Sequence, residues 1–62
     1  MNDKKIAEVV LLLVRQARYE ILPDDEKYYG EIESLQGVWA TGNTIEDCRN
    51  ELTEVLTEWL KL

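Results

Sequence analysis

Few side chains in this sequence could perform chemistry. The 62 residues include one cysteine, Cys48, and no histidine. A cysteine nucleophile needs a neighbouring base or positive charge to form its thiolate, and no imidazole is present to act as that base. Zinc and haem sites likewise lose one of their usual ligands. We therefore expect Cys48 to be a small core residue rather than a nucleophile.

The glutamates Glu20, Glu31 and Glu33 form the other candidate for chemistry. If adjacent strands carry them outward, the three carboxylates share one face of a sheet, where they could hold Mg²⁺ for phosphodiester cleavage. A metal-dependent nuclease is therefore one alternative. We favour a solvated acidic face, because no histidine accompanies the glutamates. The prediction is a protein that is not an enzyme, with no catalytic residue, cofactor or metal site.

The charge balance indicates what kind of partner the protein binds. Thirteen acidic and seven basic residues give a net charge of -6. Such a domain is repelled by the phosphates of nucleic acids and is steered toward basic protein surfaces, so we expect no direct nucleic-acid contact. The longest apolar run, Val9–Val14, is far shorter than the ~20 residues that span a bilayer, so no membrane segment is expected. A single cysteine is typical of a reducing compartment, here the cytoplasm.

The first element that must position these residues is an N-terminal helix. Apolar residues recur at helical spacing at Ile6, Val10 and Leu13, and further apolar residues at Leu11 and Leu12 widen the stripe. A helix that is apolar nearly all round is buried on two sides. In so short a chain, we expect the second side to contact another subunit, which predicts a homo-oligomer (a dimer or tetramer) formed through this helix.

Three strands are expected next, at Ala17–Leu22, Lys27–Glu33 and Val38–Thr41. Pro23–Glu26 has the composition of a turn, and Gly37 allows a second bend. Alternation along the second strand divides its side chains between two faces, with Tyr28 and Ile32 on one and Tyr29 on the other. Short connections predict antiparallel pairing.

The last helix has the clearest periodicity. Thr44 is a good N-cap, and Asp47 follows three residues later. One stripe of the helix is apolar: Ile45, Cys48, Leu52, Val55, Leu56, Trp59 and Leu60. Together, these elements predict one α+β domain over residues 1–62. It is a two-layer sandwich in the order α-β-β-β-α, with a three-stranded antiparallel sheet and both helices on one face.

Two segments resemble the HicB-like antitoxin family. The bend at 33–37 has Leu35 and Gly37 where the family pattern is Pro-Asp-Leu-Pro-Gly, although the prolines and the aspartate are replaced. Gly42, Thr44 and Glu46 match the pattern that precedes and begins the family's helix. The segments 17–20, 28–32 and 37–42 are similar to a branch of short HicB-like proteins that have a leading helix.

The resemblance implies a partial RNase-H-like fold without catalytic residues. It also implies the role of a type II antitoxin, which covers a small basic toxin of the HicA-like class that cleaves mRNA. Together with the acidic balance, this makes Tyr29, Glu31, Glu33 and Trp39 the predicted partner-binding residues, with the aromatic rings as anchors in acidic surroundings. A homo-oligomeric structural protein without a toxin stays open as a further alternative.

Overall fold

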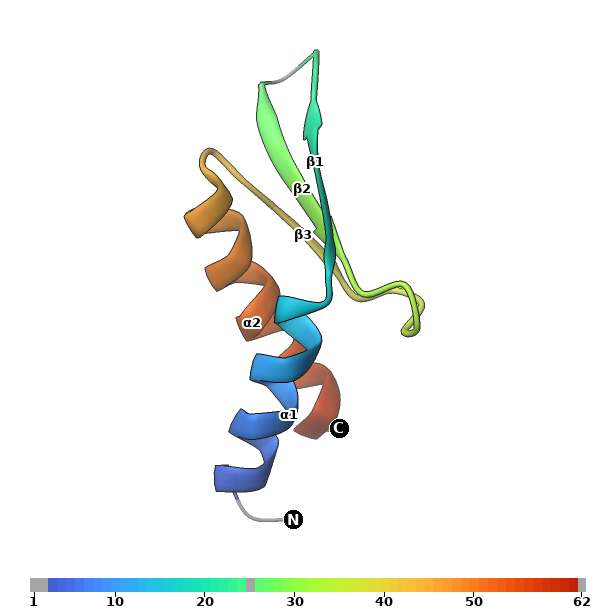
Figure 1. Ribbon diagram of the computed structural model, residues 1–62, viewed down its shortest axis with the longest axis vertical. Coiled ribbons are helices and arrows are strands. Elements are labelled where there is room, and N and C mark those ends of the chain that lie inside the picture. Colours follow the sequence, from blue (N-terminus) through green and yellow to red (C-terminus); the bar gives the residue numbers. More distant parts are fainter. Residues whose placement is uncertain (1–2, 25, 62) are drawn as a thin grey trace.

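Two helices and three strands make up the protein (Figure 1). The structure, a computed structural model, describes residues 3–24 and 26–61. Within these residues the elements are α1 (Asp3–Arg15), β1 (Arg18–Leu22), β2 (Lys27–Glu31), β3 (Trp39–Gly42) and α2 (Ile45–Lys61). The strands form an antiparallel sheet in the order β1-β2-β3. The predicted α+β class and element order are therefore confirmed.

The register of the sheet assigns each side chain to a face. Tyr19 lies opposite Gly30, which lies opposite Ala40, and this row faces α2. Tyr29 lies opposite Thr41, and Glu31 lies opposite Trp39. Residues directly opposite each other point to the same face of a sheet. The second row therefore lies on the face that no helix of the described chain covers.

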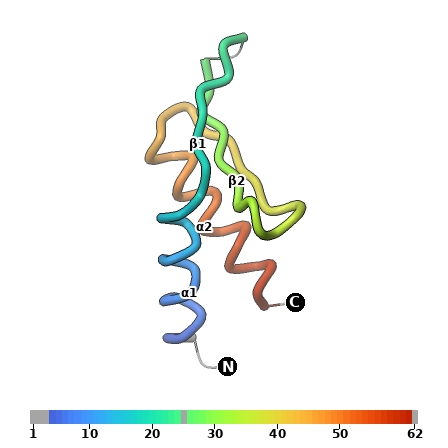
Figure 2. Tube along the Cα trace, turned by 45° about the vertical axis from the view of Figure 1, so that its right-hand side comes forward, coloured from blue at the N-terminus to red at the C-terminus, as the bar shows by residue number. Residues whose placement is uncertain are grey.

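The two helices have different packing roles. The first half of α2 lies along β2 and β3, whereas α1 continues from the lower end of the sheet and packs against the second half of α2 (Figures 1 and 2). The connection from α1 to β1 is only Gln16 and Ala17, so α1 extends away from the end of β1. We expected both helices on one face of the sheet. In the structure, α2 lies over the strands and α1 lies beside α2.

A single core joins both helices, β1, β3 and the bend that follows β2. Leu52 and Leu56 of α2 have no exposed surface, and α1 adds the buried side chains of Ile6, Val10 and Val14. The spacing of these three α1 residues places them on one helical face. The predicted apolar stripe of α2 is buried at its centre. At its two ends, Ile45 and Trp59 remain exposed.

The predicted bend and cap are confirmed at their main residues. Gly37 has a φ of +87°, which an L-residue rarely adopts. The Asp47 backbone N–H donates to Thr44 Oγ1 at 3.0 Å, as expected for an N-cap. The strand boundaries differ: β2 ends at Glu31, since the chain turns from Glu33 onward, and β3 is shifted by one residue to begin at Trp39. Of the predicted Pro23–Glu26 turn, Asp25 lies outside the described residues.

Tyr19 joins the sheet to both helices. Its ring lies against Gly30, where an added Cβ would come within 2.7 Å of the ring. Its hydroxyl donates to the Val14 carbonyl at 2.8 Å, and the Arg49 guanidinium lies 5.7 Å from the ring centre. A glycine opposite Tyr19 thus provides the space that lets the ring lie flat between α1, α2 and the sheet.

Candidate functional site

An aromatic pair lies on the open face of the sheet. The rings of Tyr29 and Trp39 are stacked, with centroids 6.1 Å apart and planes at 26°. The two residues are diagonal neighbours on adjacent strands, because Trp39 is opposite Glu31, two residues beyond Tyr29. Diagonal neighbours on one sheet face are within reach of large side chains. Trp39 is 54% exposed, so the pair is available for contact with another molecule.

Two carboxylates lie beside Tyr29 of this aromatic pair. The Tyr29 hydroxyl donates to Glu31 Oε2 at 3.2 Å. Glu20 lies directly opposite Tyr29 on β1. The pKa of Tyr29 is raised above its ordinary value of 10.0 by desolvation, then by the hydrogen bond to Glu31 and by the negative charges of Glu31 and Glu20. Tyr29 is therefore held as a neutral phenol in an acidic environment.

Glu33 lies at the margin of this surface rather than on the strand. Because β2 ends at Glu31, Glu33 belongs to the following turn. Its Oε1 atom lies 3.4 Å from Arg18 Nη1, and both side chains are exposed. Of the four predicted binding residues, the fold brings Tyr29, Glu31 and Trp39 together, while Glu33 is directed to an arginine at the edge.

Two further residues of the open face were not predicted as binding residues. Glu20 adds a carboxylate beside Tyr29, and Arg18 lies opposite Glu31. Their alternation on β1 is visible in the sequence, but their neighbours depend on the register between β1 and β2. We name the surface formed by Arg18, Glu20, Tyr29, Glu31, Trp39 and Thr41 the open-face patch.

The candidates for chemistry have other environments. Cys48 is fully buried, its thiol donates to the Ala40 carbonyl at 3.5 Å, and burial raises its pKa. These are the surroundings of the small core residue that we expected. Across residues 3–24 and 26–61, no three side chains of histidine, cysteine, aspartate or glutamate gather as a possible metal site. The carboxylates of Glu31 and Glu33 instead contact Tyr29 and Arg18.

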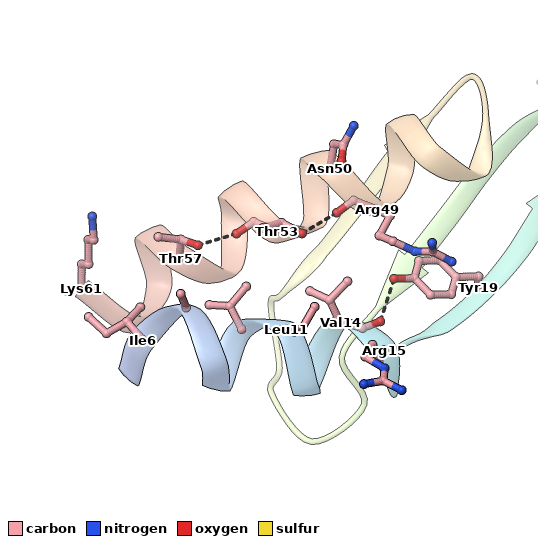
Figure 3. Close-up of a pocket in the computed structure, with 12 residues that line it drawn as sticks. Ile6, Leu11, Val14, Arg15, Tyr19, Arg49, Asn50, Thr53, Thr57 and Lys61 are labelled. Carbon is pink, nitrogen blue, oxygen red and sulfur yellow. Dashed lines mark hydrogen bonds between the residues drawn. The ribbon is translucent and has the colours of Figure 1, made fainter. Parts of the chain in front are cut away.

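A second surface feature lies between the two helices (Figure 3). It is a groove of about 780 Å³. Apolar residues of α1 form one wall: Ile6, Ala7, Val10, Leu11 and Val14. On α2, the hydroxyls of Thr53 and Thr57 donate to the carbonyls of Arg49 and Thr53, four residues earlier, at 2.8 and 2.7 Å. Because these hydroxyls bond their own helix, the α2 wall is less polar than its composition indicates.

Basic side chains also line this groove. Arg15, Arg49 and Lys61 are among its residues, and no aspartate or glutamate of the described chain is. The sequence did not reveal the groove, because a helical stripe predicts which side chains are apolar but not where two helices separate. Neither helix in the described part of the chain has the length and apolar character needed to cross a bilayer.

Comparison with known proteins shows what the chain resembles. The family model described as UPF0150-like matches residues 13–62. The crystal structure of TTHA0281 from Thermus thermophilus is similar, with a TM-score of 0.79 and 42% sequence identity. The similarity covers 87% of this chain and 71% of that one. No curated protein matches the chain.

Proposed function

Because the chain belongs to the UPF0150-like family and carries an exposed aromatic pair among carboxylates, we propose that it is a non-catalytic domain that binds a basic protein. The observation that carries the proposal is the stacked Tyr29–Trp39 pair on the open face. The domain acts by covering its partner's surface rather than by transforming a substrate.

The aromatic pair has the properties of a binding anchor. Tyrosine and tryptophan dominate the energetics of many interfaces, since they bury a large area and lose little side-chain entropy. Stacking against Tyr29 already restricts the rotamers of Trp39, so part of the ordering penalty is met before the partner arrives. The exposed ring of Trp39, stacked on Tyr29 of the central strand, is therefore well suited to docking.

The charges around the pair indicate a basic partner. Glu20 and Glu31 lie beside Tyr29, and the whole chain has a net charge of -6. An acidic surface accelerates association with a basic protein and disfavours nucleic acid. Lysine or arginine side chains of the partner would pair with Glu31 while an apolar segment covers Trp39.

The resemblance to HicB-like antitoxins gives this partner a chemical class. In that family the domain blocks a small basic toxin that cleaves mRNA. We extend the proposal to a HicA-like toxin, whose catalytic surface the open-face patch would cover. Support for this step comes from the family resemblance and the charge complementarity.

The experiment uses the protein encoded by the neighbouring gene, purified with and without this chain. We expect the wild-type protein to form a complex and to abolish RNA cleavage by that product. Trp39→Ala and Glu31→Lys should each weaken both effects at least tenfold, as expected for a central interface residue. Glu58→Lys makes the same charge change on an exposed position of α2 and should leave both effects intact. Undiminished cleavage in the presence of wild-type protein would contradict the proposal.

The same assay separates binding from catalysis. A metal-dependent nuclease would cleave RNA when this protein is incubated alone with Mg²⁺. The proposal predicts no cleavage under those conditions, and Glu20→Gln and Glu31→Gln should change complex formation only. Cleavage by the isolated protein that is lost in both variants would favour the nuclease alternative.

A further inference from the structure

The outward side of α1 carries two large exposed aliphatic side chains. Leu11 is 59% exposed and Leu12 is 56% exposed. The opposite side of the same helix supplies Ile6, Val10 and Val14 to the core. Consecutive helical residues lie about 100° apart around the axis, so Leu11 and Leu12 border the two sides of a strip of α1 that another helix can cover.

Opposite charges lie on either side of these leucines. Glu8 precedes them by about one turn and Arg15 follows them by about one turn, and both side chains are exposed. The two residues are seven positions apart, which is about 10.5 Å along a helix. This distance is too long for direct pairing. Within one chain, Glu8 and Arg15 therefore cannot neutralise each other.

This pattern is complementary to itself in an antiparallel arrangement. A two-fold axis that passes between Leu11 and Leu12 reverses the direction of a second helix. Two residues that lie at equal distances on opposite sides of the axis then face each other. Glu8 of one copy therefore faces Arg15 of the other. An isologous interface makes each such contact twice. In a parallel arrangement in register, by contrast, Glu8 would face Glu8 and Arg15 would face Arg15.

We propose that a second copy of this chain covers the outer side of α1, with the two α1 helices antiparallel about an axis between Leu11 and Leu12. The four leucines form the apolar centre of the contact, with Leu11 of each copy against Leu12 of the other. Two ion pairs between Glu8 and Arg15 flank this centre. The contact uses α1, whereas the open-face patch is formed by residues of the strands, so the two contacts involve different elements of the fold.

The groove between α1 and α2 supports this choice of occupant. Leu11 and Arg15 both line it, together with Arg49 and Lys61, and no carboxylate of the described residues does (Figure 3). In the proposed dimer, Glu8 of the second copy approaches Arg15 at the edge of the groove. Glu8 thereby brings a negative charge to the basic rim of the groove. In a single chain, the groove has no such charge among its described residues.

The size of the contact sets its expected strength. A helix of 13 residues is about 20 Å long, so a contact between two of them falls below the roughly 1,200 Å² that stable interfaces bury. The dimer should therefore have a Kd in the micromolar range. Measurements must include protein concentrations of roughly 100 µM or more to populate it.

The first test is sedimentation equilibrium of the whole protein over about 5–300 µM, which brackets a micromolar Kd. We expect a monomer–dimer equilibrium for the wild-type chain. Leu11→Gln and Leu12→Gln should each shift it toward monomer by at least tenfold in Kd. Both positions are exposed in the single chain, so circular dichroism should show unchanged helix content.

Charge reversal then tests the antiparallel register. Glu8→Arg alone and Arg15→Glu alone each place like charges opposite each other and should weaken the dimer by roughly tenfold. The double variant, Glu8→Arg with Arg15→Glu, exchanges the two partners and should restore the wild-type Kd. Glu51→Arg on the exposed side of α2 is the matched control and should leave the Kd unchanged.

Two results would overturn the proposal. A wild-type protein that remains monomeric at the highest concentration would show that no second copy covers α1. A double variant no better than the single variants would show that the helices do not pair in this register. Neither result bears on the open-face patch, whose test uses a different partner and different residues.

Discussion

The two faces of the sheet use the same strands for opposite purposes. On the face toward α2, Tyr19 fits against Gly30, and Ala40 leaves room for Cys48. On the open face, Tyr29 and Trp39 stack in contact with solvent. The side chains of the covered face are thus limited by the space between the sheet and α2. The open face has no such limit and retains large and charged side chains.

Mutations on the covered face should affect stability, and mutations on the open face should affect binding. Side chains on the covered face are held by contacts from several elements, so their replacement disturbs folding. Side chains on the open face contact one another and water. Their replacement should leave the fold intact and remove the capacity to bind.

The largest expected effect is at the centre of the covered face. Leu52 has no exposed surface, so Leu52→Ala should lower the free energy of unfolding by about 2–5 kcal/mol. A domain of this length has a total stability of only about 3–9 kcal/mol, so the variant should be partly or fully unfolded. Urea denaturation followed by circular dichroism measures the loss. Glu51→Ala, on the exposed side of the same helix, should change the value by less than about 0.5 kcal/mol.

The next effect concerns the turn between β3 and α2. A Cβ on Gly42 would lie 2.8 Å from the Cα of Cys48, and backbone atoms cannot move aside as a flexible side chain can. Gly42→Ala should therefore destabilise the protein by about 1–3 kcal/mol. Gly37→Ala is the comparison, because its Cβ meets no atom within 4 Å and only the φ of +87° is unfavourable. A Gly42→Ala variant as stable in thermal unfolding as the wild-type protein would refute the close approach at Gly42.

The aromatic pair tests the open face directly. Tyr29→Ala and Trp39→Ala should each lower stability by only about 1 kcal/mol and should each weaken partner binding at least tenfold. A double-mutant cycle on urea unfolding should give a coupling energy of about 0.5–1.5 kcal/mol for the stacked rings. If Trp39→Ala were as destabilising as Leu52→Ala, the division between the two faces would be wrong.

The smallest effect is a shift in the titration of Tyr29. Desolvation and the charges of Glu31 and Glu20 raise the pKa of Tyr29 above 10.0, so a spectrophotometric titration at alkaline pH should show it ionising after an ordinary tyrosine. Glu31→Gln should bring the pKa back toward its ordinary value, whereas Glu58→Gln should not. Because the folded-state pKa is the higher one, this contribution to stability is complete below the unfolded-state pKa of 10.0 and is lost as the pH rises through the folded-state value.

Much of the fold was predictable, because its determinants are local. Helical spacing identified both helices, and Thr44 and Gly37 marked the cap and the bend. The strand ends were not predictable, because they depend on the bonds of the turn that follows. The strand β2 stops at Glu31, where the turn around Leu35 begins to form its own backbone hydrogen bonds. In that turn the Leu35 N–H donates to the Ile32 carbonyl at 3.0 Å. That difference moved Glu33 away from the other predicted binding residues.

The candidate site shows the same division. Alternation on β2 predicted that Tyr29 and Glu31 share a face. The stacking of Tyr29 on Trp39 required the register between β2 and β3, which depends on the length of the loop and on the packing of Gly30 and Ala40 beneath α2. The groove between α1 and α2 was not predictable at all, since it depends on how the helices diverge.

The class of fold, the acidic charge of the protein and the apolar character of both sides of α1 follow from the order of the amino acids alone. These properties follow from composition and from periodicities of two and about 3.6 residues, which are local consequences of backbone geometry. Three other features depend on the folded arrangement: which helix covers the sheet, which carboxylates lie beside Tyr29, and which leucines of α1 remain exposed. Those outcomes depend on contacts between residues far apart in the chain, where a one-residue change of register or a short connection reverses the result.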